Sequence, residues 1–151
     1  MSAEADGVEG LRLLVGRKLG YSEWLKVTAD QVALFAEATG DRQWIHLDRE
    51  RAAAGRFGST IVHGFLILSL TPMLLEQILE MRGFSVSVNY GCDRVRFLAP
   101  VLVGTQVRAG ATLNAVRELR GGAELSLTVV FQARGSRVPV CVAQVVLRNY
   151  V

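Results

Sequence analysis

Residues 61–81 read IVHGFLILSLTPMLLEQILEM and form the most apolar stretch of the chain. Its unbroken apolar runs fall far short of the ~20 residues that a membrane-spanning helix needs, so the stretch predicts a helix that is buried by protein. Ser59 or Thr60 is expected to cap the start of this helix. Pro72 has no N–H to donate to the carbonyl of Leu68, which predicts a kink or a boundary between two helices.

The sequence after this stretch alternates with a period of two. Segments rich in Val, Leu and Thr are separated by turns that contain Gly104, Gly121 and Gly135. This pattern predicts three or four antiparallel strands joined by tight turns. The segments are residues 84–89, 95–98, 106–115, 124–133 and 138–150.

The sequence before the apolar stretch predicts a strand, a helix and a long loop. Residues 21–27 alternate enough for a strand, and Thr28 with Gln31 forms the pattern of a capping box. A helix is expected over Ala29–Thr39, with Gly40 as its C-terminal stop. The order strand, helix, loop, buried helix and strands predicts a single α+β domain in which an antiparallel sheet wraps around a long central helix.

The N-terminal segment is expected to form its own small unit. Residues 8–19 favour a short amphipathic helix or an arm, weakened by Gly10 and Gly16. We therefore divide the chain into an arm or short helix over residues 1–20 and a domain over residues 21–151. The first six residues carry two acids and no apolar segment, which is atypical of a signal peptide, so no targeting segment is expected.

Composition disfavours several classes of protein. The chain has 151 residues, half of them hydrophobic, with 17 Lys+Arg against 14 Asp+Glu and a net charge of +3. This length suits one domain with its own core, and the apolar content argues against disorder. No basic run exceeds two residues, so a nucleic-acid-binding module is the least favoured function. The two cysteines lack CxxC spacing, which argues against a disulfide framework or a zinc site and favours a cytoplasmic protein.

The loop over residues 40–60 holds the residues best suited to chemistry, because a loop this long in a compact domain is usually functional. Four residues separate Asp41 from His46. A carboxylate and an imidazole can together hold and deprotonate one water molecule near neutral pH. Two structural interpretations stand beside this one: Asp41 can be a turn residue that bonds its own backbone, and His46 can be a satisfied core histidine.

Other residues of this region have structural and functional interpretations as well. Asp48 is favoured as the N-cap of a short helix, and His63 as the anchor of a backbone carbonyl. For Trp44, a packing role is favoured rather than stacking against a substrate. A glycine early in a buried helix is costly, so Gly64 implies either close packing against the sheet or an N–H that points at a substrate oxygen.

Three segments of this region carry a family resemblance. They read GDRQWIHLD (residues 40–48), AAAGRFG (residues 52–58) and IVHGFLILSL (residues 61–70). Together they resemble the MaoC-like dehydratase family, which has the hotdog fold and includes the (R)-specific enoyl-CoA hydratases. A later stretch, NYG followed by VRFLAPV at residues 95–101, resembles the family's next strand and turn. Many members have Asn-Pro where this chain has Gln43-Trp44, a version that resembles the nodulation-protein-N-like branch.

The resemblance implies a hydro-lyase of fatty-acid metabolism that interconverts trans-2-enoyl and (3R)-3-hydroxyacyl thioesters. In that family the residues matching Asp41 and His46 are the catalytic pair, and the N–H of the residue matching Gly64 binds the thioester carbonyl. The resemblance implies neither a metal nor a cofactor, because CoA or an acyl-carrier protein bears the substrate.

The resemblance also implies a homodimer with an acyl tunnel near its interface. Candidates for lining this tunnel are Trp44, Phe57 and Phe65. Arg94 or Arg96 is a candidate contact for the phosphates of CoA, although arginines on strands are more often solvated.

Two other functions stay open. One is a catalytically silent hotdog protein that binds acyl thioesters, and the other is a hotdog acyl-CoA thioesterase. The intact Asp41 and His46 pair favours the enzyme over the silent protein. The same spacing points away from a thioesterase, which must deliver water to the carbonyl carbon.

Overall fold

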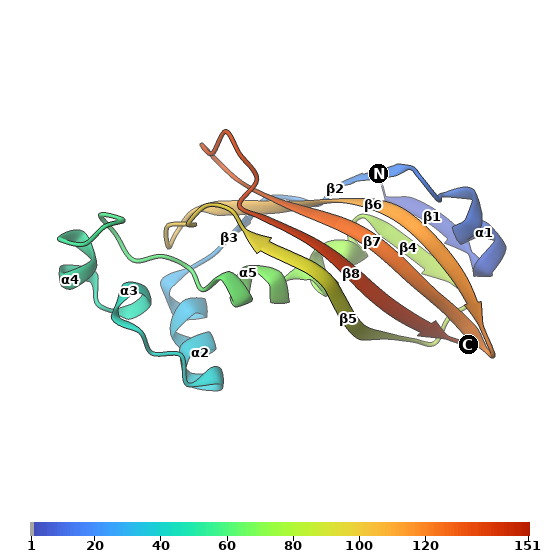
Figure 1. Ribbon diagram of the computed structural model, residues 1–151, viewed down its shortest axis with the longest axis horizontal. Coiled ribbons are helices and arrows are strands. Elements are labelled where there is room, and N and C mark those ends of the chain that lie inside the picture. Colours follow the sequence, from blue (N-terminus) through green and yellow to red (C-terminus); the bar gives the residue numbers. More distant parts are fainter. Residues whose placement is uncertain (1) are drawn as a thin grey trace.

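The computed structural model describes residues 2–151, and an antiparallel sheet dominates it (Figure 1). Its main strands lie in the order β2-β6-β7-β8-β5, and the short β3 (Leu25–Lys26) also pairs with β6. Period-two alternation explains why these segments form strands, and tight turns such as the one at Gly121, with φ of 75°, reverse the chain between them. The strands are β2 (Lys18–Tyr21), β5 (Val86–Phe97), β6 (Gln106–Leu119), β7 (Gly122–Ala133) and β8 (Cys141–Tyr150).

The strand predictions are largely confirmed, with two corrections. The two segments expected between residues 84 and 98 form the single strand β5, whose register shifts at two irregular positions along β8. The strand expected over residues 21–27 is divided between β2 and β3, because the backbone N–H of Ser22 still bonds to Ala109 while the chain leaves the sheet before Leu25.

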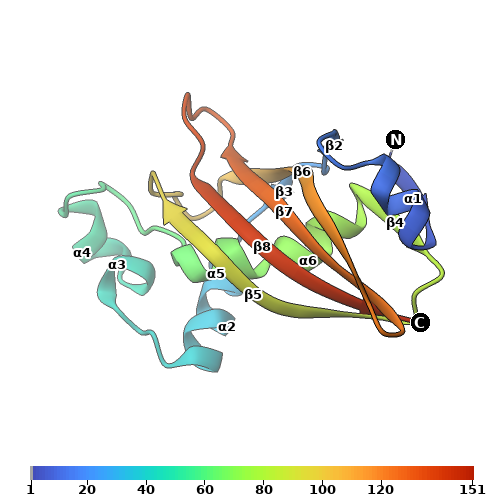
Figure 2. The ribbon, with the colours of Figure 1, turned by 45° about the vertical axis from the view of Figure 1, so that its right-hand side comes forward.

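Two short helices, α5 (Gly64–Ser69) and α6 (Thr71–Glu76), run along one face of the curved sheet (Figures 1 and 2). The predicted boundary at Pro72 is confirmed, because Pro72 lies in the first turn of α6, where its missing N–H is tolerated. The central helix is therefore two segments and shorter than expected. The prediction that Ser59 or Thr60 caps it is wrong, since Ile61 is bridged to Leu102 before the helix begins.

The C-terminal end of the expected helix is also different. Leu79–Arg82 forms the strand β4, which pairs in parallel with β1 (Ala3–Asp6). The helix α1 (Gly7–Leu13) follows β1, so a short helix is present in the segment expected to form a helix or an arm, but it ends at Leu13 and residues 18–19 belong to β2. The sequence pattern of residues 79–82 fits a helix equally well, and only the pairing partner at the far N-terminus makes it a strand.

The core lies between the sheet and helices α5 and α6. Every second side chain of β7 points inward, and Leu125, Leu127, Val129 and Phe131 have no exposed surface. Each such side chain contributes about 1.5–3 kcal/mol through burial of apolar surface. From the helical layer, Leu74 of α6 completes this core. The sheet thus holds α5 in a fixed position, and α5 begins at Gly64.

A second group of helices lies beyond the end of the sheet, beside the start of α5 (Figure 1). Helix α2 (Ala29–Thr39) has the predicted bounds and capping box, and Gly40 adopts the left-handed conformation with φ of 78°. Helices α3 (Trp44–Leu47) and α4 (Arg49–Ala53) follow it. The Asp48 carboxylate caps α4 by accepting from the Arg51 N–H at 3.0 Å, as predicted. Within residues 2–151, no helix has the length and apolar character to cross a membrane.

Candidate active site

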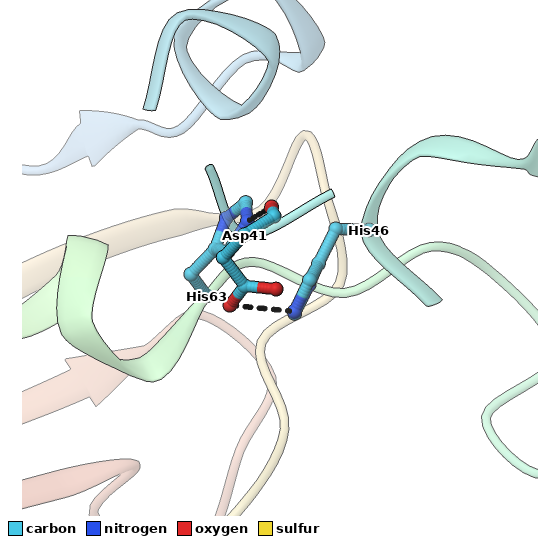
Figure 3. Close-up of side chains that lie close together, drawn as sticks. All are labelled: Asp41, His46 and His63. Carbon is cyan, nitrogen blue, oxygen red and sulfur yellow. Dashed lines mark hydrogen bonds and ion pairs between the residues drawn. The ribbon is translucent and has the colours of Figure 1, made fainter. Parts of the chain in front are cut away.

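Asp41 and His46 lie close together, as their spacing predicts. Asp41 follows the Gly40 turn at the end of α2, and His46 lies on α3 (Figure 3). Asp41 Oδ2 and His46 Nε2 are 3.9 Å apart. The Asp41 side chain is 52% exposed, whereas that of His46 is 8% exposed. The site therefore joins a solvated carboxylate to a buried imidazole.

The two carboxylate oxygens of Asp41 have different surroundings. Oδ1 accepts a long hydrogen bond of 3.4 Å from the backbone N–H of Gln43, which is the turn contact considered for this residue. Oδ2 faces His46. The structural and chemical interpretations of Asp41 are thus compatible, because one oxygen shapes the turn and leaves the other available.

His46 has a defined proton position. Its Nδ1 lies 2.6 Å from the backbone carbonyl oxygen of Ile61. A carbonyl oxygen only accepts hydrogen bonds, so Nδ1 carries the hydrogen and Nε2 of the neutral ring presents a lone pair towards Asp41. Burial lowers the pKa of His46 below its usual value, opposed by the Ile61 carbonyl and, more weakly, by the charge of Asp41. His46 is therefore a neutral imidazole at pH 7.

His63 belongs to the same cluster, which the sequence did not predict. Its Nε2 donates a hydrogen bond of 3.0 Å to the backbone carbonyl of Asp41, so its predicted role as a carbonyl anchor is confirmed. Its ring also stacks on His46, with centroids 3.8 Å apart and planes 23° from parallel. The only signal for this contact is that both histidines of the chain fall within 18 residues.

The cluster does not fit a metal ion. Asp41, His46 and His63 each place a potential ligand atom within 4.8 Å of the other two. However, imidazole lone pairs lie in the plane of the ring, and the two rings are stacked almost in parallel. Their lone pairs therefore cannot converge on one ion, and His63 Nε2 is already committed to a carbonyl.

The gap between Asp41 and His46 suits a single water molecule. Oδ2 and the Nε2 lone pair are both acceptors and are too far apart for a direct hydrogen bond. A water molecule can donate one hydrogen to each, which leaves its oxygen lone pairs directed away from both groups. The pair can thus orient a water nucleophile and accept its proton.

Gly64 is packed tightly against β5. A Cβ atom at this position would lie 2.9–3.0 Å from ring carbons of Phe97, so the packing interpretation of this glycine is confirmed. Gly64 also lines a hollow of about 290 Å³. Beside Gly64 and Phe97, the hollow is lined by Phe57, Ile61, Val62, Ile67, Leu98, Ala99, Pro100, Val101 and Val140.

The remaining candidate binding residues occupy several places. Phe57 lines the hollow beside Gly64, and Phe65 packs edge-on against Phe97 while 68% exposed. Trp44 instead packs between Arg51 and Gly55 and lines a separate small hollow with Phe57. Arg94 and Arg96 are exposed on β5. Their roles in binding substrate stay predictions.

Comparison with known proteins places this arrangement in a family. Residues 12–132 match the model of the MaoC-like domain. The chain is 45% identical over 144 residues to 3-hydroxyacyl-thioester dehydratase Z of Mycobacterium tuberculosis, with 95% of each chain covered. It is 44% identical over 116 residues to Nodulation protein N of Rhizobium leguminosarum bv. viciae, covering 76% of this chain and 71% of that protein.

A solved structure supports the same conclusion for the fold. The (R)-hydratase from Aeromonas caviae involved in PHA biosynthesis matches with a TM-score of 0.73 and 32% identity. The match covers 88% of this chain and 94% of that one. The sheet wrapped around α5 and α6 is therefore the hotdog fold that the sequence predicted.

Proposed function

The chain belongs to the MaoC-like dehydratase family, and on this basis we propose that it is an (R)-specific trans-2-enoyl-CoA hydratase. Its relatives include a named dehydratase and a named hydratase, so the chain is a hydro-lyase acting on 3-hydroxyacyl thioesters in fatty-acid metabolism. The proposed reaction adds water reversibly across the C2=C3 bond of an enoyl thioester and gives the (3R)-3-hydroxyacyl product.

The separation of 3.9 Å between Asp41 Oδ2 and His46 Nε2 is the observation that carries the proposal. Water addition needs a nucleophile that is held and deprotonated at neutral pH. A carboxylate and a neutral imidazole that share one water supply both requirements, and such acid–base catalysis is worth roughly 10²–10⁴ in rate. No metal and no redox cofactor takes part in the proposed reaction.

In the proposed mechanism the water oxygen attacks C3 while Asp41 takes one of its protons. His46 Nε2 accepts the hydrogen bond of the other O–H and fixes the direction of attack. The new C3–O bond displaces the π electrons towards the thioester oxygen, which gives an enolate. The protonated Asp41 then returns its proton to C2 on the same face, so the carboxylate is regenerated and water has been added syn.

The enolate oxygen needs a hydrogen-bond donor, and we assign this role to the Gly64 N–H. Gly64 is the first residue of α5, so its N–H has no partner within the helix. A single donor at a developing oxyanion is worth on the order of 10²–10³ in rate. Phe57 and Phe65 are proposed to line the path of the acyl chain, with Trp44 at its margin, and Arg94 or Arg96 to contact CoA.

We also propose that the protein is a homodimer joined through β5. This strand ends the sheet and pairs with β8 on one side, while Val86, Val88 and Tyr90 are 44–56% exposed. A long apolar edge strand is a template for pairing with another chain. Lysines introduced by Val86→Lys and Val88→Lys should convert a dimer to a monomer in sedimentation, and monomeric wild-type protein would exclude this arrangement.

One assay tests the proposed activity against its alternatives. Purified protein is mixed with crotonyl-CoA, and the enoyl absorbance and free thiol are followed together. Hydration removes the absorbance without releasing thiol. Thiol release would instead indicate a thioesterase, and tight binding without either change would indicate a silent acyl-thioester-binding protein.

The stereochemistry is tested in the reverse direction. The enzyme should dehydrate (3R)-3-hydroxybutyryl-CoA and leave the (3S) isomer unchanged, whereas dehydration of the (3S) isomer would contradict the assignment. The same assay with an acyl-carrier-protein thioester compares the two carriers. A cytoplasmic location stays a prediction.

A further inference from the structure

A group of arginines lies on the outer face of the sheet, opposite α5 and α6. Arg108 of β6 is directly across from Gln132 of β7, and both point away from the core because their neighbours Val107 and Phe131 are fully buried. Arg134 and Arg137 belong to the hairpin that joins β7 to β8 and projects from the end of the sheet (Figures 1 and 2). None of these residues takes part in the proposed chemistry.

Arg108 is held in place by its surroundings. Its guanidinium lies 4.2 Å from the ring centroid of Tyr21 and 4.7 Å from that of Trp24. Its Nε donates a hydrogen bond of 2.9 Å to Gln132 Oε1. Tyr21 lies flat on the sheet because Gly110 leaves room for it: a Cβ there would be 2.7 Å from the ring. The guanidinium is thus oriented before any ligand arrives.

The positive charge of this group is not compensated within residues 2–151. Arg134 lies 4.9 Å from the Trp24 ring, so two guanidinium groups share one aromatic side chain. Arg108, Arg134 and Arg137 form no ion pair with any carboxylate of the described chain. Elsewhere on the same face, Arg117 and Arg148 both bind Glu124. The three cations line one hollow, so they repel one another, and an anion between them would relieve that repulsion.

These arginines surround a hollow of about 260 Å³. Its walls include Trp24, Gln132 and Ser136 beside the arginines, so most of its exposed lining is polar. Guanidinium groups bind phosphate through paired N–H donors, and their charge persists at every pH the protein meets. Because Arg108 and Arg134 already occupy the Trp24 ring, the hollow suits phosphate groups better than a stacked base.

We propose that this hollow is a binding site for nucleotide phosphates. This hollow and the hollow beside Gly64 have neighbouring lining residues on the hairpin, since Pro139 lines the first and Val140 lines the second. The phosphates are those of the CoA that carries the substrate, an assignment that rests on the proposed function and gives them to Arg108 and Arg134 rather than to Arg94 or Arg96. The site itself rests only on the arginines and can be tested without any reaction.

The first experiment measures binding. A Trp44→Phe variant leaves Trp24 as the reporter in the hollow, since the chain has two tryptophans. Pyrophosphate and adenosine 3′,5′-bisphosphate are titrated at constant ionic strength. We expect a saturable change in fluorescence and about tenfold weaker binding for Arg108→Gln and for Arg134→Gln, as loss of one charge-assisted contact predicts.

The control is Arg120→Gln, which removes an exposed arginine from the turn between β6 and β7 and should leave the affinity unchanged. Absence of saturable binding, or equal weakening by Arg120→Gln, would overturn the site. Binding by a protein without hydratase activity would leave the site standing and refute the proposed function instead.

The second experiment identifies the source of the phosphates. Crotonyl-CoA is compared with crotonyl-N-acetylcysteamine, which has the same reacting group but no nucleotide. If the hollow holds CoA, Arg108→Gln should raise KM for crotonyl-CoA about tenfold and leave KM for the short thioester nearly unchanged. An equal change for both substrates, with phosphate binding still weakened, would contradict the assignment to CoA and indicate a separate phosphorylated ligand.

Discussion

The helical end of the molecule and the outer face of the sheet use charge in opposite ways. At the helical end, His46 and His63 are buried and stacked, and the partner of His46 is one half-exposed carboxylate. On the outer face, Arg108 and Arg134 lie on aromatic rings and keep their charge. The first region holds groups that can exchange a proton with a bound water, and the second holds guanidinium groups that stay charged.

This difference separates two kinds of work on a charged thioester substrate. Proton transfer needs a group whose pKa is set by burial and by its neighbours, which requires a partly dry site with few charges. Recognition of a permanent anion needs fixed cations. Substitutions at the helical end should therefore change turnover and its pH dependence, while those on the outer face should change affinity.

The largest effect is expected from Asp41→Asn. The amide oxygen can still accept from the Gln43 N–H, so the turn should persist, but the side chain can no longer take a proton from water. We expect kcat for hydration to fall by roughly 10²–10⁴, with little change in thermal stability. Stopped assays with crotonyl-CoA and a melting curve of the same sample check this. A folded variant with near-normal turnover would remove Asp41 from the mechanism.

The next effect isolates the Gly64 N–H. Proline suits the first position of a helix, and His63 before it already has an extended backbone, with φ of −56° and ψ of 132°. A side chain at Gly64 would meet Phe97, so the comparison is made in a Phe97→Ala background. There, Gly64→Ala and Gly64→Pro both add a Cβ, but only the second removes the N–H.

We expect kcat for Gly64→Pro to be lower than that for Gly64→Ala by about 10²–10³, the usual value of one oxyanion donor. Equal turnover in the two double variants would leave Gly64 with its packing role alone. Circular dichroism of both proteins shows whether α5 is retained.

Local signals in the sequence explain which features could be predicted. Thr28, Gln31 and Gly40 define helix α2 from within its own few residues, and Pro72 marks the division between α5 and α6. The Asp41 and His46 pair was predictable for the same reason, since both lie on one short loop and helix. Each of these predictions depends on residues that are near neighbours in the chain.

Features that depend on distant partners were missed. Residues 79–82 form a strand only because Ala3–Asp6 pairs with them, and no periodicity reveals a partner more than 70 residues away. The stacking of His63 on His46 depends on the path of the chain between α4 and α5. The hollow on the outer face combines Trp24, Arg108 and Arg134, which the fold alone brings together.

A smaller effect is expected at His63, which positions Asp41 and His46. His63→Gln can keep an N–H donor near the Asp41 carbonyl but loses the ring, whereas His63→Phe keeps a ring against His46 but loses the donor. We expect His63→Phe to lower kcat about tenfold and His63→Gln to lower it less. This loss is smaller than the roughly 10²-fold loss of rate that a 1 Å misplacement of a catalytic group can cause.

A second measurement tests whether the His63 variants lose activity because His46 and Asp41 are displaced or because the protein loses structure. The charge of His63 lowers the pKa of His46, so that pKa should rise in both variants and can be followed from the one remaining imidazole signal by NMR. A His46 pKa that does not move in either variant would show that the two rings are not coupled, and equal kcat in both variants would exclude the carbonyl contact as the cause.

The smallest effect is the pH dependence of stability. Burial lowers the pKa of His46 in the folded protein below the value of about 6.5 that it has when unfolded. Between these two pKa values the unfolded chain binds more protons than the folded protein, so the free energy of unfolding rises with pH. The contribution of His46 to stability is therefore lost as pH falls below about 6.5. Urea unfolding from pH 7.5 to pH 5 should show this decrease, and His46→Gln should abolish it. Arg108→Gln should retain the wild-type slope, because arginine does not titrate in this range. A slope that persists in His46→Gln would show that His46 is not the titrating group.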